Sequence, residues 1–220
     1  MSSDFSLEQL LAELGHEDAP VEFDWNAPEA GQYAPSIQPG VYEFIPSLRS
    51  DAGVGGFDKV VVDGHKHLQA ILDFDVIVPG KDNAKVTYQR VSTYKHEKVA
   101  ISSMGEFLRS VGLHTQIPER PSYEDITRVL MSSNGHARGR GEAAWRFYCK
   151  THGLTISTSP RKRKGIKDEA WPKDASGNLE PSVVCPKCAA ANPATPKSYG
   201  QVEFIRYFSQ KPESAASATS

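Results

Sequence analysis

The sequence predicts a mainly β fold with a few helices. Several segments alternate apolar and polar residues with a period of two, which is the pattern of half-buried strands. Two short segments with helical periodicity and serine caps fall between the third and the fourth of these strands. A long stretch rich in turn residues, with two pairs of metal-ligand side chains, interrupts the chain before the last strand. These three features indicate one β domain with a large insertion.

Residues 1–37 differ from the rest of the chain in charge. They hold eight acidic residues and no Lys or Arg, a formal charge of −8, so that the remainder carries +6. A short amphipathic helix is expected here, followed by a Pro-rich flexible tether. We expect this acidic arm to dock on a protein partner or to compete with a polyanion for a basic surface. The helix is predicted from four leucines at helical spacing, Leu7, Leu10, Leu11 and Leu14.

Three strands are predicted to open the folded domain. Val41–Pro46 follows a Pro-Gly turn, and Asp51–Phe57, with three glycines, is expected to be a loop. Leu68–Val78 places six apolar residues on one face, as a long half-buried strand does. Pro79–Asn83 is a turn sequence, which predicts a hairpin to a third strand at Lys85–Tyr94.

Two helices are predicted after the third strand. Ser102 opens the first with a sequence that resembles a capping box, and the helix ends at Gly112. Ser122 caps the second, which runs to Met131. Gly135–Gly141 is rich in Gly and Arg and is expected to be a flexible basic loop.

The remaining strands complete the predicted order. They are Ala143–Lys150, Leu154–Thr158 and, as the last strand, Gln201–Phe208. The tail 209–220 is small and polar, which is typical of disorder.

Helices between the third and fourth strands of a five-stranded barrel are the arrangement of an OB-type fold, whose surface and loops bind oligonucleotides. We therefore predict a mainly β fold with α-helices, built as a five-stranded OB-type barrel with a zinc-knuckle insertion before the last strand. Residues 38–208 form this OB-like domain, and residues 149–188 form the insertion within it.

The insertion carries all three cysteines of the chain. Cys149 with His152, and Cys185 with Cys188, each place two soft ligands three residues apart, so that one turn can aim both at a single ion. Together they suit a closed tetrahedral Cys₃His site for structural Zn²⁺, because no position stays open for water. The 32 residues between His152 and Cys185 exceed the usual spacing of a zinc ribbon. We expect an extended loop there, with His136 as a reserve ligand.

Two other chemistries fit these motifs less well. A redox-active C-x-x-C pair usually opens a helix in a βαβ unit, whereas three alanines, Asn and Pro follow Cys188 and indicate a loop. A zinc deaminase needs Pro before the first Cys of C-x-x-C and a Glu two residues after a His. Val184 stands in the first position and no His of the chain has that Glu, so a deaminase is excluded.

The chain around the cysteines is basic. Arg138–Lys173 holds ten basic and three acidic residues, which points to a polyanionic partner. Single-strand binding needs a basic groove and exposed rings, because phosphates are charged and bases stack. We expect a ring and a guanidinium group to share one strand face in two places, Tyr88 with Arg90 and Tyr148 with Arg146. Val86 is expected on the same face as Tyr88 and Arg90. The predicted nucleic-acid-binding residues are Tyr88, Arg90, Arg146, Tyr148, Arg161, Lys162, Arg163 and Lys164.

Four short segments carry a resemblance to a known family. They are Pro39–Tyr42, Leu68–Val78, Leu108–Gly112 and Val202–Phe204. Their layout resembles that of tailed-phage single-stranded-DNA-binding proteins with an OB fold. The resemblance implies a non-catalytic protein, often dimeric, that coats replication or recombination intermediates in the bacterial host cytoplasm, with RNA as an alternative ligand. The tail Lys211–Ser220 lacks the acidic, aromatic-tipped end through which bacterial homologues recruit partners.

Two other functions stay open. A metal-dependent nuclease or hydrolase is one, because a group of acids and histidines offers ligands for Mg²⁺. The alternative for that group is a turn at Asp63-Gly64 followed by a solvated strand face. The other function is a zinc-ribbon adaptor that binds proteins through the zinc loop and the N-terminal helix. The candidate nuclease ligands are Asp63, His65, His67, Asp73 and Asp75.

The compartment is expected to be the cytoplasm. No apolar run reaches the roughly 18 residues that span a bilayer, and the N-terminus lacks the pattern of an export signal. With all cysteines assigned to metal, a reducing environment fits the sequence.

Overall fold

The computed structural model describes residues 35–95, 101–159 and 167–209. The predicted arm up to residue 34, the basic run Arg161–Lys164 and the tail beyond Ser209 lie outside the described residues. The chain divides into two compact units. Of the described residues, the first unit contains 42–141 and 206–209, and the second unit contains 35–41 and 142–205.

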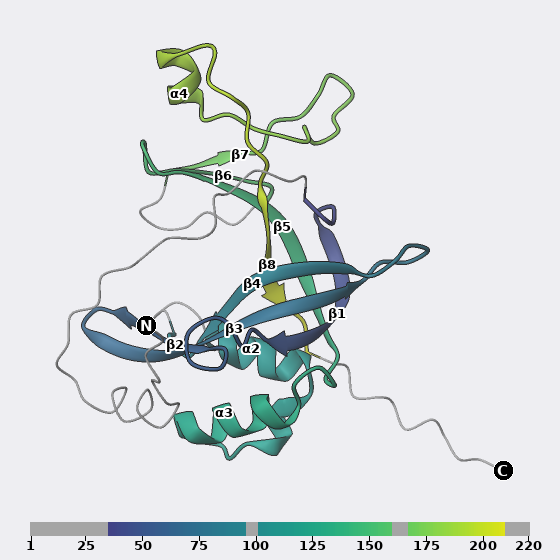
Figure 1. Cartoon of the computed structure of the whole chain (residues 1–220), viewed down its shortest axis with the longest axis vertical. Helices are drawn as coiled ribbons and strands as arrows, with labels where there is room; N and C mark the ends of the chain where they lie inside the picture. Colours follow the sequence, from purple (N-terminus) through teal and green to yellow (C-terminus); the bar gives the residue numbers. More distant parts are fainter. Residues whose placement is uncertain (1–34, 96–100, 160–166, 210–220) are drawn as a thin grey trace. The chain divides into compact units, whose positions relative to one another are not determined.

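Four strands contribute to the first unit (Figure 1). They are β1 (Gly40–Leu48), β2 (Phe57–Val62), β3 (His65–Ile77) and β4 (Ala84–Ser92). β3 pairs antiparallel with β2 through its first half and with β1 through its second half, and β4 occupies its other edge. β1, β3 and β4 confirm three predicted strands, whereas β2 was not predicted.

A β-bulge in β4 changes which of its residues face the core. Thr87 and Tyr88 stand opposite the single residue Asp73 of β3, and Tyr88 has a positive φ of 56°. The extra residue moves every later side chain of β4 to the opposite face. Val86 is therefore buried while Arg90 is exposed. The prediction that these two residues share a face is wrong.

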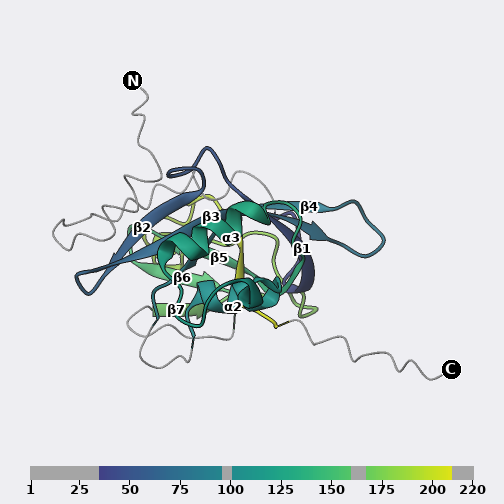
Figure 2. The same cartoon turned by 90° about the horizontal axis from the view of Figure 1, so that it is seen from below.

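Two helices complete the first unit and confirm the predicted pair. α2 (Ser103–Ser110) and α3 (Tyr123–Ser132) lie side by side in both views (Figures 1 and 2), and a short 3₁₀ helix, Leu113–Gln116, follows α2. None of the helices in the described part of the chain is long and apolar enough to cross a bilayer.

Serine caps fix where both helices begin. The Ser102 hydroxyl accepts the backbone N–H of Gly105 at 3.2 Å. No reciprocal bond forms here, because glycine has no side chain to return it. Ser122 and Asp125 do form a full capping box, in which each side chain binds the other's backbone N–H.

Aromatic rings form the centre of the first unit's core. Phe44 stacks on Phe74 with ring centroids 4.2 Å apart, and Phe107 and Tyr207 pack around them. All four side chains are buried. The chain passes close to this cluster at Gly139, where a Cβ atom would lie 2.5 Å from the Phe44 ring. A larger residue at that position would therefore collide with the core.

The remaining elements are three strands and one short helix of the second unit, with a final strand. They are β5 (Gly139–Cys149), β6 (Leu154–Ser157), β7 (Lys167–Ala170), α4 (Pro186–Ala191) and β8 (Gln201–Tyr207). β5 and β6 form an antiparallel hairpin, and β7 joins β6 in parallel. β5, β6 and β8 confirm predicted strands, whereas β7 and α4 were not predicted. Because β5 begins at Gly139, the end of the predicted flexible basic loop is part of a strand.

The strands form one open mixed sheet of eight strands. The order of neighbours is β2-β3-β1-β5-β6-β7, with β4 paired to β3 and β8 paired to β5. The predicted mainly β fold with helices is confirmed. The predicted five-stranded barrel is not, because the paired strands of the described chain form an open sheet and the insertion adds β6 and β7 to it.

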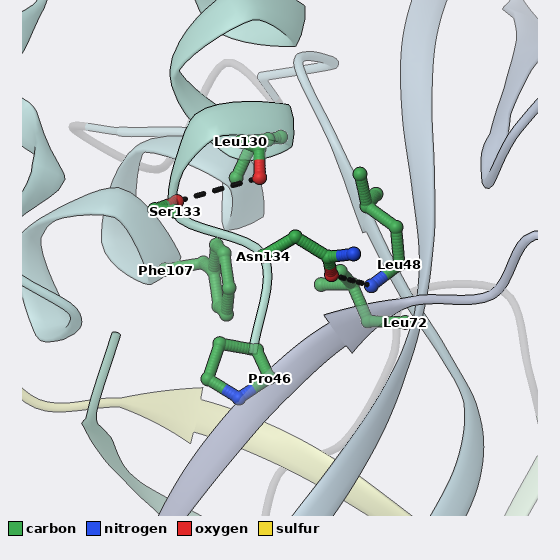
Figure 3. Close-up of a pocket in the computed structure, with 7 residues that line it drawn as sticks. All are labelled: Pro46, Leu48, Leu72, Phe107, Leu130, Ser133 and Asn134. Carbon is green, nitrogen blue, oxygen red and sulfur yellow. Dashed lines mark hydrogen bonds between the residues drawn. The ribbon is translucent and has the colours of Figure 1, made fainter. Parts of the chain in front are cut away.

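A small hollow lies in the first unit (Figure 3). Its volume of about 10 Å³ holds at most one water molecule. Leu72, Phe107 and Leu130 line it with apolar surface, and the Asn134 side chain accepts the backbone N–H of Leu48 at 2.6 Å on one side. This hollow is a packing feature and not a ligand site.

Candidate metal centre

The four predicted metal ligands come from two segments of the second unit that are far apart in sequence. Cys149 is the last residue of β5, and His152 lies in the turn to β6, where its N–H bonds to the Cys149 carbonyl at 3.3 Å. Cys185 caps α4, and Cys188 stands in the first turn of that helix. The ligand atoms of all four residues lie within 4.8 Å of one another. The predicted grouping of these side chains is confirmed.

The separations between the ligand atoms suit a tetrahedral zinc ion. The Sγ atoms of Cys149 and Cys188 are 3.6 Å apart. The His152 Nδ1 atom lies 3.4 Å from the Cys188 Sγ and 3.6 Å from the other two sulfurs. Tetrahedral bonds of about 2.3 Å to sulfur and about 2.0 Å to nitrogen require roughly 3.8 Å between sulfurs and about 3.6 Å between sulfur and nitrogen. Three thiols and one imidazole at these separations fit Zn²⁺ through Nδ1 of the histidine.

Hydrogen bonds fix the segment that carries Cys185 and Cys188. Val183 and Ser198 exchange two backbone bonds of 2.8 and 2.7 Å, which close the chain on either side of α4. Within that closure the Thr195 hydroxyl donates to the Cys188 carbonyl at 3.2 Å. The long spacing between the two ligand pairs is partly ordered, since β6 and β7 lie inside it.

The metal centre is part of the hydrophobic core of the second unit. Cys149 and Cys185 belong to the same buried cluster as Trp145 and Trp171, whose rings meet edge to face with centroids 5.6 Å apart. Because the candidate ligands are also core residues, a metal bound there would couple its binding to the folding of this unit. The other buried members of the cluster are Leu154, Ile156 and Val183.

The two tryptophans are held in fixed positions in this core. The indole N–H of Trp145 donates to the Ile37 carbonyl at 2.8 Å, and that of Trp171 donates to the Glu180 carbonyl at 2.9 Å. Gly200 allows the chain to pass close to Trp171, because a Cβ atom there would lie 2.6 Å from the ring.

The surroundings of the thiols favour ionisation of Cys185 and oppose that of Cys188. Burial opposes ionisation of Cys185, but hydrogen bonds from the backbone N–H groups of Cys188 and Lys187 and from the side chains of Cys149 and Cys188 together hold the pKa of Cys185 below its ordinary value. Burial raises the pKa of Cys188 to about 11, and the neighbouring sulfurs of Cys149 and Cys185 act in the same direction. A bound cation supplies the positive charge that would let all three thiolates form together.

Of the nucleic-acid contacts predicted on β5, the tyrosine is exposed and the arginine is paired. Tyr148 is 49% exposed, although it directly precedes the buried ligand Cys149. Arg146 forms an ion pair with Glu203 of β8. Arg146 is therefore engaged with a carboxylate, and Tyr148 is the accessible member of the predicted pair.

The other predicted contacts lie in the first unit or outside the described residues. Tyr88 is half-buried, and the Arg49 guanidinium covers its ring with the central carbon 3.9 Å from the ring centroid. The Tyr88 N–H donates to the Asp73 carboxylate at 3.2 Å, which holds the strained backbone of the bulge. Arg90 is exposed on β4. Arg161, Lys162, Arg163 and Lys164 fall in the part that the structure does not describe.

The group predicted for Mg²⁺ binding does not form a site in the described chain. Asp63 and Gly64 have φ values of 53° and 81° and make the turn between β2 and β3. Asp73 is buried and ion-paired with Arg49 at 3.2 Å and Lys85 at 3.5 Å. Within the described ranges, the Cys and His group is the one cluster of three or more such side chains arranged to hold a metal. The reserve ligand His136 is exposed and stands outside that cluster.

Comparison of the chain with protein-family models, with curated proteins and with solved structures gave no match.

Sequence reasoning missed the residues that support the centre. The Val183–Ser198 pairing joins positions with no local strand pattern, so no sequence signal indicates it. Trp171 does have a signal, because a lone tryptophan in a polar stretch rich in Lys, Pro and Gly is typical of a buried anchor.

Proposed function

We propose that the chain binds single-stranded nucleic acid, DNA in the first place, and that a structural Zn²⁺ held by Cys149, His152, Cys185 and Cys188 organises the contact surface. The observation that carries this proposal is the exposure of Tyr148 beside the metal centre. With 49% of its surface exposed, the Tyr148 ring is accessible to a base that could stack on it.

The position of Tyr148 suits base stacking. Its backbone pairs with Thr155 of β6, and the next residue is the metal ligand Cys149. The ring therefore projects from a strand that is fixed on one side by the hairpin and at its end by the ligand. A ring held in this way loses little conformational freedom when a base stacks on it, and stacking contributes about 1–3 kcal/mol per base.

Basic residues lie near the candidate metal ligands in the sequence. Lys150 and Lys187 are exposed neighbours of metal ligands. The basic run Arg161–Lys164 belongs to the chain between the two ligand pairs. An exposed ring combined with basic residues is what binds single strands without sequence preference, because phosphates are neutralised while bases stack.

The strand order also supports the proposal. Five strands follow one another in pairing order as β4-β3-β1-β5-β8, and α2 and α3 lie between β4 and β5 in the chain. We interpret them as a partly open OB-type barrel into which the metal-bound segment is inserted. A role in coating replication or recombination intermediates, as in the tailed-phage proteins that the motifs resemble, is part of the same proposal.

We expect Tyr148→Ala to lower affinity for a labelled single-stranded oligonucleotide roughly 5- to 150-fold, because one stacking contact is lost. The dependence of log K on log salt should stay nearly unchanged, since stacking releases few counterions. Fluorescence anisotropy at several salt concentrations measures both quantities, with zinc content checked for each protein.

Tyr148→Phe is the matched control, because it keeps the ring and removes only the hydroxyl group. It should bind as the unsubstituted chain does. Equal affinity of the Ala and Phe variants would show that this ring is not the contact and would remove the main support for the proposal.

A further inference from the structure

Two arginines at the junction of β5 and β8 in the first unit share one aromatic ring. The guanidinium carbon of Arg140 lies 5.9 Å from the centroid of Phe208, and that of Arg206 lies 5.3 Å from it. Both distances are within the range of cation–π attraction. The backbone N–H of Phe208 donates to the Arg140 carbonyl at 2.9 Å, so the ring is fixed to the strand that carries one of the arginines.

The strand beneath Arg140 is held firmly. Gly139 and Gly141 on either side of it are buried, and the close approach of Gly139 to Phe44 fixes the backbone against the aromatic core. Arg140 and Arg206 are themselves exposed. The two guanidinium groups therefore project into solvent from a rigid base.

Neither guanidinium has a carboxylate partner in the described part of the chain. Two other arginines of the first unit do, since Arg49 pairs with Asp51 and Asp73, and Arg128 pairs with acids of its own helix. Two like charges that share one ring repel each other, and the ring attracts each by only about 0.5–1 kcal/mol at an exposed site. An anion with two or more negative groups would relieve that repulsion.

We propose that Arg140 and Arg206, positioned by Phe208, form a second contact for single-stranded nucleic acid, in which the two guanidinium groups bind backbone phosphates. This inference rests on the proposed function. Guanidinium groups suit phosphate because their planar N–H donors match its oxygens in pairs. The contact lies in the first unit, whereas the contact proposed above lies beside the metal centre in the second.

The test is a salt titration of binding to a labelled single-stranded oligonucleotide by the full chain and three variants. In the Arg140→Ala/Arg206→Ala variant the magnitude of the slope of log K against log salt should fall by about 1.4, because each phosphate contact contributes about 0.7. Affinity at about 0.1 M salt should fall roughly 25-fold for the same reason. The Arg140→Lys/Arg206→Lys variant keeps the charge and should keep the slope. Arg128→Ala is the control, because it removes one positive charge from an exposed arginine that is already ion-paired.

The outcomes separate this inference from the proposed function. Binding by the unsubstituted chain together with an unchanged slope in the double Ala variant would overturn this contact and leave the proposed function standing. A fall of about 0.7 in the magnitude of the slope for Arg128→Ala would also overturn it, since the effect would then reflect net charge. If the unsubstituted chain binds no single strand, both proposals are wrong.

Discussion

Removal of the metal is expected to unfold the second unit while the first unit keeps its structure. Two of the metal ligands, Cys149 and Cys185, belong to the buried cluster that forms the core of the second unit. Structural zinc contributes about 10–16 kcal/mol in small domains, which matches or exceeds the whole stability of a typical domain at about 5–15 kcal/mol. The first unit has a separate aromatic core around Phe44 and Phe74, with no metal ligand in it.

Tryptophan fluorescence can follow this change. Trp145 and Trp171 are both buried in the core that contains the candidate ligands Cys149 and Cys185. A Trp25→Phe background removes the third tryptophan of the chain, which lies outside the described residues. Adding a chelator should shift the emission to longer wavelength, and calorimetry should then show one remaining unfolding transition. Zinc should restore the original spectrum.

Two substitutions test whether the change in fluorescence depends on the four candidate ligands. Cys185→Ser should lose the metal and reproduce the chelated state without chelator. His136→Ala removes an exposed histidine that stands outside the cluster and should keep full metal content. An unchanged tryptophan spectrum after complete metal removal would contradict the coupling between the metal and the core of the second unit.

The second large effect is expected from the basic run in the insertion. Replacing Arg161, Lys162, Arg163 and Lys164 with Ala removes four positive charges between the two ligand pairs. If all four contact phosphates, the magnitude of the slope of log K against log salt falls by about 2.8 and affinity at about 0.1 M salt falls several hundred-fold. The measurement is again a salt titration with a single-stranded oligonucleotide.

A variant that keeps the four positive charges tests whether charge, and not the identity of each side chain, determines the slope. Exchanging each arginine for lysine and each lysine for arginine keeps four positive charges, so the slope should stay near that of the unsubstituted chain. A normal slope in the four-alanine variant would show that the insertion does not contact the strand.

Local patterns predicted much of the fold. The alternation in Leu68–Val78 gave the position of β3, and the serine caps at Ser102 and Ser122 gave the starts of α2 and α3. Spacing alone identified the four residues that the structure brings together as a candidate metal site, because each pair sits on one turn and can aim at a shared ion. These features depend on residues that are close together in sequence.

The features that were missed depend on contacts between distant segments. β7 pairs in parallel with β6, which no alternation within Lys167–Ala170 indicates. The bulge at Tyr88 arises opposite Asp73 of another strand, and it reverses the faces that a strict period of two predicts. The ion pair between Arg146 and Glu203 joins two strands far apart in sequence, so Arg146 was expected to be available to a phosphate.

The barrel prediction shows how an insertion alters a fold. The five-strand barrel prediction placed residues 149–188 outside the barrel as an insertion, although Leu154–Thr158 within them was predicted to be a strand. In the structure, β6 and β7 extend the sheet beyond β5. Two of the candidate metal ligands lie at the end of β5 and in the turn before β6, so the extension of the sheet begins at the candidate metal centre.

Binding of the full, zinc-loaded chain to a labelled single strand and to the matching duplex, at the same salt concentration, tests the central claim most directly. We predict clear binding to the single strand and much weaker binding to the duplex, because paired bases cannot stack on Tyr148. Equal affinity for the two, or no binding to the single strand, would contradict the claim that this protein is a single-strand-binding protein.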